Sequence, residues 1–445
     1  MKKIVVLGGG ESGTGAAILA AKQGYEVFLS DKSSIDESYK KVLKNHEIRF
    51  EEGKHSLSEI LNADEIIKSP GIPDHISLIK SIHEKGIPII SEIEFAARFT
   101  DAKLICITGS NGKTTTTLLI HHILKNAGLN VGLAGNIGKS FAWQVTENNF
   151  DIYVLEISSF QLDGMFQFKA DIAILTNITP DHLDRYDNSF ENYTQSKFRI
   201  LQNMTSSDYL IYNADDPVIE QKLSKRKLNM RLIPFTLQNK AMKEGAYLEN
   251  ENININISKD NLTMTLKELA LQGKHNIYNS MAAGVTGKLQ NIRNKSIKDS
   301  LAEFQNIDHR MQSVANIGGV EFINDSKATN VNSTYFALDS VRKPIIWIAG
   351  GKDKGNDYSS LDDLVQSRVK AIVCLGLDNQ KIIHHFGKMI PIIIQTYTAQ
   401  EAVEEAHKLA NSGDVVLLSP ACASFDLFED YEERGNRFID AVNEL

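Results

Sequence analysis

The chain has 445 residues, which is enough for about three domains of ordinary size. Hydrophobic residues make up 42% of it, a share that is typical of globular proteins and excludes the disordered and fibrous classes. The net charge of −8 is spread along the chain without long runs of one sign, so general affinity for nucleic acid through phosphate neutralisation is disfavoured.

Short apolar runs rich in valine and isoleucine alternate with amphipathic stretches, which is typical of β-α-β units with buried parallel strands. The first series predicts strands at residues 4–7, 26–30, 65–67 and 87–90. A helix is expected at 12–23, and Ser91 is the expected N-cap of a second helix that ends at 97. We place a domain boundary near residue 91.

The second series predicts helices at 113–126 and 276–289 and strands at 104–107, 153–155, 172–175 and 209–212. Between residues 240 and 266 the pattern changes to polar residues with a period of two. That alternation predicts a hairpin annex to the main sheet.

The third series predicts strands at 345–348, 371–375, 392–394 and 415–418, and the chain ends in a helix expected at 427–443. The predicted fold class is therefore α/β, with three successive modules of parallel sheet. Ligands are expected at the carboxyl ends of the strands, where such modules bind them.

The three cysteines, Cys106, Cys374 and Cys422, lie far apart in apolar runs. Reduced core thiols in a cytoplasmic protein fit this pattern better than a disulfide framework. The N-terminal apolar run is too short for a signal peptide, and no segment has the ~18 apolar residues of a membrane span, so we expect neither secretion nor membrane insertion.

A glycine-rich turn, Gly8-x-Gly10-x-x-Gly13, follows the first predicted strand and opens the first helix. Asp31 ends the second strand about 20 residues later, which completes a dinucleotide-binding fingerprint. Glycines there let a pyrophosphate approach the N-terminus of the helix. The pattern leaves open whether the ligand is NAD or a nucleotide sugar.

A second loop, residues 108–115, reads Thr-Gly-Ser-Asn-Gly-Lys-Thr-Thr between a strand and a helix. Its backbone N–H groups and the Lys113 ammonium can bind phosphates, and a hydroxyl can reach Mg²⁺. The loop is two residues shorter than a full Walker A motif, because its first glycine is Gly109. Phosphate binding is nevertheless the prediction.

Polar residues at other strand ends extend this candidate site. Glu156 ends a strand and can offer a carboxylate to Mg²⁺, while Asp181 and His182 follow another strand. In the last third, small, polar and charged residues gather in loops that suit the recognition of anions and amines. These loops span residues 308–310, 324–330, 350–355 and 419–426.

Taken together, these segments resemble the Mur ligases of peptidoglycan synthesis. The resemblance covers essentially the whole chain and also includes residues 135–138, 156–162, Lys197, and the His275 to Asn279 segment. Residues 419–425 are similar to the branch of the family that adds D-glutamate. The Asp-Asn-Pro-Arg motif of the diaminopimelate-adding relatives is absent from this sequence.

The resemblance implies three domains. These are a Rossmann-like UDP-binding domain at 1–91, a central P-loop ATPase-type domain at 92–306, and a Rossmann-like amino-acid-binding domain at 307–445. It also implies an ATP-dependent ligase that joins D-glutamate to UDP-N-acetylmuramoyl-L-alanine through an acyl phosphate, with Mg²⁺ as cofactor. Such an enzyme is expected to be a cytoplasmic monomer that serves cell wall biogenesis, cell shape and cell division.

The family correspondence also implies a role for individual residues. Catalysis is expected of Lys113, Glu156, His182 and Lys197. Metal ligands are expected to be Thr114, Glu156, His182 and a carbamylated Lys197. ATP is expected to contact Gly109, Ser110, Asn111, Gly112, Lys113, Thr114, Thr115, Asn276, Arg310 and Asp325. The UDP substrate is expected to contact Gly10, Glu11, Ser12, Gly13, Asp31, Lys32, Ser33, Ser69, Asn136, Ser158 and His182. D-glutamate is expected to contact Lys327, Thr329, Lys354, Ser424, Phe425 and Tyr431.

Other functions compete with this interpretation. An L-alanine-adding Mur ligase or a folylpolyglutamate synthetase would share most of the motifs. An NAD-dependent dehydrogenase would use the Gly8 turn but leave residues 109–115 without a role. A guanine-nucleotide switch usually carries Asn-Lys-x-Asp, which does not occur in this sequence.

Overall fold

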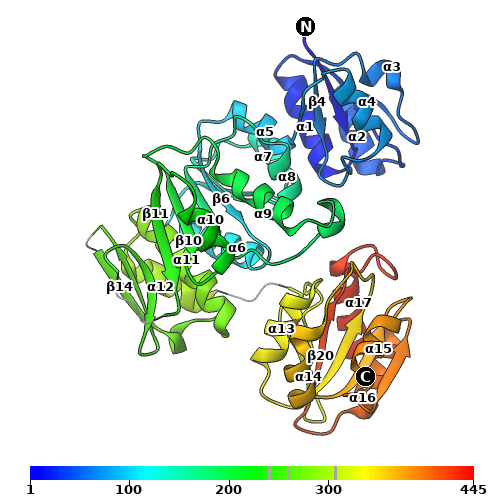
Figure 1. Cartoon of the computed structure of the whole chain (residues 1–445). Coiled ribbons are helices and arrows are strands. Elements are labelled where there is room, and N and C mark those ends of the chain that lie inside the picture. The colour runs from blue at the N-terminus through cyan, green and yellow to red at the C-terminus, as the bar shows by residue number, and fades with distance from the viewer. Residues whose placement is uncertain (239–241, 259, 305–307) are drawn as a thin grey trace. The chain divides into compact units, whose positions relative to one another are not determined.

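The computed structural model describes residues 1–238, 242–258, 260–304 and 308–445 (Figure 1). Its strands form three sheets, which confirms the predicted α/β class with three modules. The chain divides into two compact units, Met1–Leu269 with Asn276–Phe304, and Ala270–His275 with Gln305–Leu445. The expected boundary at residues 306 and 307 lies outside the described residues. Within the described ranges, no helix is long and apolar enough to cross a bilayer.

The first sheet is parallel and has the strand order β3-β2-β1-β4-β5. Its strands are β1 Lys3–Leu7, β2 Glu26–Ser30, β3 Arg49–Glu51, β4 Glu65–Lys68 and β5 Ile89–Ile90. The helices that accompany them are α1 Glu11–Lys22, α2 Glu37–Asn45, α3 Leu57–Ile60 and α4 Ser77–Glu84. Because β1 is buried along its whole length, its apolar run reads as a continuous stretch in the sequence.

The second sheet has nine strands in the order β14-β13-β12-β11-β10-β9-β6-β8-β7. They are β6 Lys103–Thr108, β7 Val131–Gly135, β8 Ile152–Glu156, β9 Ile172–Leu175, β10 Tyr209–Asn213, β11 Arg231–Thr236, β12 Gly245–Glu249, β13 Asn252–Ile257 and β14 Asp260–Thr265. Its helices are α5 Glu92–Ala96, α6 Lys113–Asn126, α7 Phe141–Glu147, α8 Ser159–Asp163, α9 Phe190–Phe198, α10 Pro217–Ser224, α11 Lys274–Leu289 and α12 Asn294–Glu303.

The predicted hairpin annex is part of this second sheet. Strand β13 pairs antiparallel with both β12 and β14, and β12 continues the sheet by pairing parallel with β11. The isoleucines of β13 are buried and its asparagines are half-buried. The alternation of the two residue types therefore reflects a strand with one buried face. No local pattern in the sequence predicted the third strand, β14, or the junction with β11.

The third sheet has the order β15-β16-β20-β17-β18-β19, and only its β15–β16 pair is antiparallel. Its strands are β15 Gln312–Ile317, β16 Val320–Asn324, β17 Ile345–Gly350, β18 Val369–Leu375, β19 Ile393–Thr396 and β20 Val415–Ala421. Its helices are α13 Val331–Ser340, α14 Asp362–Arg368, α15 Gln380–Phe386, α16 Ala399–Leu409 and α17 Tyr431–Asn443.

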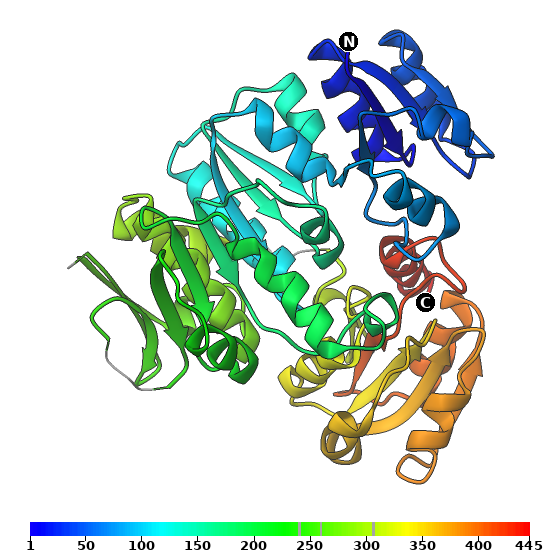
Figure 2. The ribbon, with the colours of Figure 1, turned by 45° about the horizontal axis from the view of Figure 1, so that its top comes forward.

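Both faces of the third sheet are covered. Alternate residues of β17 belong to two different hydrophobic clusters, with Trp347 in one and Ile346 and Ile348 in the other. Figure 2 shows helices on both faces of this sheet. The three cysteines are free and buried, as predicted for core thiols.

The terminal helix begins later than predicted, at Tyr431 instead of residue 427. Asp430 is its N-cap, because its carboxylate accepts a hydrogen bond from the Glu433 N–H. Leu427 and Phe428 lie before the helix and pack against the core, so their apolar character reflects burial and not helical periodicity.

Candidate active site

The phosphate loop joins β6 to α6. Gly109 (φ +147°) and Gly112 (φ +80°) adopt backbone conformations that favour glycine, and a Cβ on Gly109 would lie 2.0 Å from the Thr176 hydroxyl oxygen. Lys113 is the first residue of α6, and its Nζ donates to the carbonyls of Gly109 and Ser110 at 2.9 Å each. The ammonium therefore lies over the loop, where it could contact a phosphate bound by the loop N–H groups.

The segment after β9 holds the phosphate loop in shape. The backbone N–H groups of Ser110 and Asn111 donate to the carbonyl and side-chain oxygens of Asn177, at 2.8 and 2.9 Å. The Ser110 hydroxyl donates to the Thr179 carbonyl at 2.8 Å. No local pattern in the sequence predicted a role for Asn177 and Thr179, because only the pairing of β6 with β9 brings them beside the phosphate loop.

Glu156 ends β8, the strand beside β6. Its side chain is 2% exposed, and one carboxylate oxygen, Oε1, accepts a hydrogen bond from the Asn136 amide at 2.9 Å. The other oxygen, Oε2, is buried and has no hydrogen-bond partner within the described part of the chain. An unpartnered buried carboxylate oxygen next to a phosphate loop fits the chemistry of a hard cation such as Mg²⁺.

Lys197 lies in α9 with 2% of its surface exposed, and its Nζ donates to the Thr108 hydroxyl at 3.2 Å. Burial and then the Lys113 ammonium hold the pKa of the Lys197 amine well below its usual range, while Asp181 and Glu156 act in the opposite direction. A lowered pKa increases the neutral fraction of the amine, which is the form that can react with carbon dioxide.

His182 adopts a left-handed backbone conformation (φ 51°) after β9. Its Nε2 lies 3.6 Å from a carboxylate oxygen of Asp181, and its ring meets that of Phe160 edge-on with 5.1 Å between centroids. Phe160 belongs to α8, so the imidazole is held between the segment after β9 and the helix after β8.

Helix α11 contributes an asparagine pair to the phosphate loop. The Asn279 side-chain oxygen accepts from the Thr116 hydroxyl at 3.2 Å and would lie 2.6 Å from a Cβ on Gly112. The Asn279 amide donates to the Asn276 side-chain oxygen at 3.1 Å. Asn276, which is expected to contact ATP, is therefore hydrogen-bonded to Asn279, and Asn279 lies next to the phosphate loop.

The glycine turn of the first sheet is tightly built. Gly8 has φ +99°, and a Cβ on Gly13 would lie 1.9 Å from the Gly8 carbonyl oxygen. The Asp31 carboxylate accepts from the Gly9 N–H at 2.6 Å and from the Ser33 N–H at 2.7 Å. Asp31 therefore supports the turn that carries the free N–H groups of the α1 N-terminus.

Other residues expected at the UDP substrate have structural partners in this unit. The Glu11 carboxylate accepts from the Ser140 N–H at 2.9 Å. Ser158 is the N-cap of α8 and forms a capping box with Gln161. Ser69 approaches the turn, since its hydroxyl oxygen would lie 2.5 Å from a Cβ on Gly8.

In the second compact unit, Asp325 follows β16 and is buried. Burial raises the pKa of its carboxyl to about 6, against the Arg310 charge and hydrogen bonds from the Ser419 hydroxyl (3.0 Å) and the Met311 N–H (3.2 Å). The Nε of Arg310 is buried without a hydrogen-bond partner within the described ranges. These two residues, both expected at the ATP, form a polar site that still has capacity for a ligand.

Five of the six residues expected at D-glutamate lie in loops at the carboxyl ends of β16, β17 and β20, and the sixth, Tyr431, is the first residue of α17. Lys327 Nζ donates to the Tyr431 hydroxyl at 3.0 Å, and the loops after β17 and β20 are joined by reciprocal backbone bonds between Lys352 and Ala423. Ser424 is buried, whereas Phe425 is 67% exposed. Thr329 follows Lys327, and Lys354 lies half-buried in the loop after β17.

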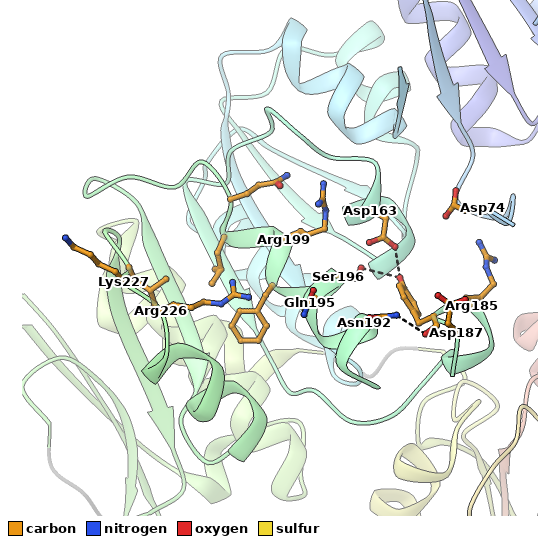
Figure 3. Close-up of a pocket in the computed structure, with 15 residues that line it drawn as sticks. Asp74, Asp163, Arg185, Asp187, Asn192, Gln195, Ser196, Arg199, Arg226 and Lys227 are labelled. Carbon is orange, nitrogen blue, oxygen red and sulfur yellow. Dashed lines mark hydrogen bonds between the residues drawn. The ribbon is translucent and has the colours of Figure 1, made fainter. Parts of the chain in front are cut away.

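A pocket of about 860 Å³ lies along α9, the helix that contains Lys197 (Figure 3). Arg185, Arg199 and Asp163 are among its lining residues, and Asp163 accepts from the Tyr186 hydroxyl at 2.8 Å. None of the residues predicted to bind substrate or metal lines it. The pocket therefore lies outside the set of predicted binding residues, so its volume does not identify the substrate.

Comparison with known proteins gives a consistent picture. Residues 3–78 match the MurD N-terminal domain model, residues 107–287 match the Mur ligase middle domain model, and residues 309–422 match the Mur ligase, glutamate ligase domain model. The three matches follow one another in the same order as the three sheets.

Two named relatives match along their whole length. The chain is 55% identical over 444 residues to the UDP-N-acetylmuramoylalanine--D-glutamate ligase of Christiangramia forsetii. It is 54% identical over 449 residues to the enzyme of that name from Bacteroides fragilis, and both matches cover 100% of each chain. A solved structure with a similar fold is the UDP-N-acetylmuramate-alanine ligase of Thermotoga maritima, with a TM-score of 0.63, 19% identity and 100% coverage of both chains.

Proposed function

We propose, because this chain belongs to the Mur ligase family, that it is the ATP-dependent ligase that joins D-glutamate to UDP-N-acetylmuramoyl-L-alanine. The observation that carries the proposal is the full-length identity of 55% to a relative that bears this activity in its name. The site supports it, since a phosphate loop with Lys113 lies beside the buried carboxylate of Glu156 and the buried amine of Lys197.

The reaction needs two chemical steps. A carboxylate resists attack by an amine, so ATP first phosphorylates the alanine carboxylate to an acyl phosphate. The amine of D-glutamate then attacks the acyl carbon, and the tetrahedral intermediate expels phosphate to form the amide. The products are UDP-N-acetylmuramoyl-L-alanyl-D-glutamate, ADP and phosphate.

The residues of the phosphate loop would bind ATP and stabilise phosphoryl transfer. The Lys113 ammonium already lies over the loop carbonyls and would offset charge on the transferring group. In our proposal the loop residues 109–115, Asn276, Arg310 and Asp325 contact ATP. The raised pKa of Asp325 and the unpartnered Arg310 Nε support a ligand between these two side chains.

The donor set also fits Mg²⁺. Thr114 and Glu156 are the proposed ligands of an ATP-linked Mg²⁺, and His182 and a carbamylated Lys197 are those of a second Mg²⁺. The ions would neutralise phosphate charge during transfer. The buried, unpartnered Oε2 of Glu156 supports this assignment. Within the described residues no group of three His, Cys, Asp or Glu side chains is placed to hold a metal ion, so the proposed sites would take their remaining ligands from phosphate or water oxygens.

The remaining assignments follow the three sheets. We propose that the turn at Gly10 to Gly13, in which Glu11 contributes its backbone, binds UDP together with Asp31, Lys32, Ser33 and Ser69, and that Asn136, Ser158 and His182 contact the muramyl part. Lys327, Thr329, Lys354, Ser424, Phe425 and Tyr431 would bind D-glutamate. The domain limits of 1–91, 92–306 and 307–445 belong to the same proposal, as does a cytoplasmic monomer that serves cell wall biogenesis, cell shape and cell division.

One assay tests the proposal. Phosphate release from ATP is measured with UDP-N-acetylmuramoyl-L-alanine and, in turn, D-glutamate, L-glutamate, D-alanine and L-alanine. Release should require D-glutamate, and the product mass should increase by one glutamyl residue. Turnover with UDP-N-acetylmuramate and L-alanine instead would assign the chain to the alanine-adding branch and contradict the proposal.

A further inference from the structure

We propose that Glu11 is a positioning residue that links the glycine turn of the first sheet to Asn136 and Glu156 in the second sheet. The inference rests on the proposed function, because it assumes that a uridine diphosphate binds at the N-terminus of α1. Binding of UDP at that turn would thereby affect how Asn136 and Glu156 are oriented at the reacting end of the substrate.

Glu11 is the first residue of α1, where an anion would approach the free backbone N–H groups of the helix. Its carboxylate does not cap these groups. It accepts instead from the backbone N–H of Ser140, at 2.9 Å, across 129 residues of sequence. The side chain thereby leaves the N–H groups of α1 available to a diphosphate, while it accepts a hydrogen bond from the start of α7.

The two helices that Glu11 joins are in close contact. A Cβ on Gly15 of α1 would lie 2.2 Å from the Ser140 hydroxyl oxygen and 3.1 Å from Cβ of Trp143. Ser140 is the N-cap of α7, and its hydroxyl accepts from the Trp143 N–H. The Glu11 bond is thus made at the point where α7 begins and where α1 has no side chain to keep the helices apart.

A second carboxylate holds the same end of α7. Glu92, the first residue of α5, is buried, and its Oε1 accepts from the Ala142 N–H. The start of α7 is therefore fixed from both sides by acidic side chains that lie outside the second sheet. Both hydrogen bonds restrain the backbone that they bind, but burial raises the pKa of the Glu92 carboxyl to about 7, so its bond is only partly charge-assisted near neutral pH.

The segment that precedes α7 leads to the metal candidate. Asn136 lies four residues before Ser140, its N–H donates to the Glu156 carbonyl at 2.8 Å, and its side-chain amide donates to Glu156 Oε1 at 2.9 Å. A Cβ on Gly135 would lie 2.2 Å from that same carbonyl oxygen, so the segment has little freedom to shift. Residues 136–140 therefore span the distance between Glu11 and Glu156 as one short, restrained connection.

Charge explains how a ligand would act through this connection. A diphosphate at the α1 N-terminus repels a nearby carboxylate, which favours the Glu11 conformation that binds Ser140. Binding of the UDP group then holds residues 136–140 in place and orients Asn136 against Glu156. A variant without the carboxylate should bind UDP but lose this effect.

Trp143 makes the effect measurable. The chain has two tryptophans, so Trp347→Phe leaves Trp143 at the start of α7 as the single emitter. In this background UDP should change the emission of Trp143. Glu11→Ala should reduce the change at least about fivefold and lower kcat for ligation about tenfold, while the Kd for UDP from calorimetry stays within about threefold.

Two further variants complete the test. Glu11→Gln keeps a carbonyl acceptor for the Ser140 N–H but lacks the charge that a diphosphate would repel, so it should restore part of kcat without restoring the UDP-dependent change in Trp143 emission. Glu37→Ala removes an exposed carboxylate from the same first position of the neighbouring helix α2 and should change neither signal. A UDP affinity that falls in proportion to activity in Glu11→Ala would show a direct UDP contact and overturn the inference.

The proposed function can fail separately. If the parent chain ligates D-glutamate and Glu11→Ala has normal kcat and a normal Trp143 response, only the positioning role is wrong. If the parent chain neither binds UDP nor ligates D-glutamate, the proposed function fails, and the positioning role fails with it.

Discussion

Replacing Asp325 with asparagine should change how the stability of the second compact unit depends on pH. Burial raises the pKa of this carboxyl from an ordinary 3.8 to about 6. A group whose pKa is higher in the folded state favours folding while it is protonated. Its contribution is therefore complete below pH 3.8 and is lost as the pH rises through 6.

The size of the effect follows from the two pKa values. Each pKa unit corresponds to about 1.36 kcal/mol, so a rise from 3.8 to about 6 amounts to about 3 kcal/mol. Between pH 4 and pH 8, roughly 2 to 3 kcal/mol of this is lost. Asparagine does not titrate, so over that range the free energy of unfolding of Asp325→Asn should rise relative to the parent by this amount.

Trp347 reports on the unit that contains Asp325. It is fully buried, and its indole Nε1 donates to the carbonyl of Ser419, whose hydroxyl donates to Asp325. In a Trp143→Phe background, its emission follows unfolding of this unit in denaturant at each pH. Comparing parent and variant cancels the titration of all other groups.

Two results would contradict the reasoning. A difference in unfolding free energy between parent and Asp325→Asn that stays constant within about 0.5 kcal/mol from pH 4 to pH 8 would show that the carboxyl is not destabilised by burial. The same pH dependence in Asp363→Asn, which removes an exposed carboxylate at the start of α14, would show that the effect is not specific to Asp325.

Three further predictions concern activity. Lys113→Ala should lower phosphate release more than about tenfold, equal to about 1.4 kcal/mol in the barrier, with unchanged circular dichroism; a smaller loss would contradict its role at the phosphates. Lys197→Ala should be nearly inactive and partly rescued by acetate, whereas normal turnover would identify it as a structural lysine. Lys354→Ala and Ser424→Ala should each raise the KM for D-glutamate roughly 10- to 150-fold, the effect of losing about 1.5 to 3 kcal/mol. Equal weakening of all three substrates would refute a D-glutamate site there.

Local signals in the sequence were sufficient for most of the fold. The helix predicted at 113–126 is α6 with the same limits, and the apolar runs of the parallel strands coincide with buried strands. Period, capping residues and glycine position act within a few residues, so they can be recognised without knowledge of the tertiary structure. The third sheet's β15–β16 hairpin was missed, because β15 is only partly buried and its alternation is weak.

The site residues also differ in whether a local pattern in the sequence predicts them. Lys113 and its glycines stand in one contiguous motif, so the sequence alone predicts their chemistry. Asn177 and Asn279 support the loop from segments about 65 and 165 residues away, and no local pattern distinguishes them from other asparagines. The bond between Glu11 and Ser140 also joins distant segments, and it gives Glu11 a side-chain partner that the glycine motif does not predict.

Three buried ionisable groups carry an unfavourable free energy in the folded protein. Glu156, Lys197 and Asp325 are each about 2% exposed, although burying an unpaired charge is strongly unfavourable. Protein partners compensate for only part of this, because Glu156 keeps an oxygen without a hydrogen bond and the pKa values of Lys197 and Asp325 are shifted toward their neutral forms. In the proposed function, a cation beside Glu156 and carbamylation of Lys197 would each lower this cost in the first compact unit. A ligand that compensates one of these groups should therefore raise the free energy of unfolding of the compact unit that contains it.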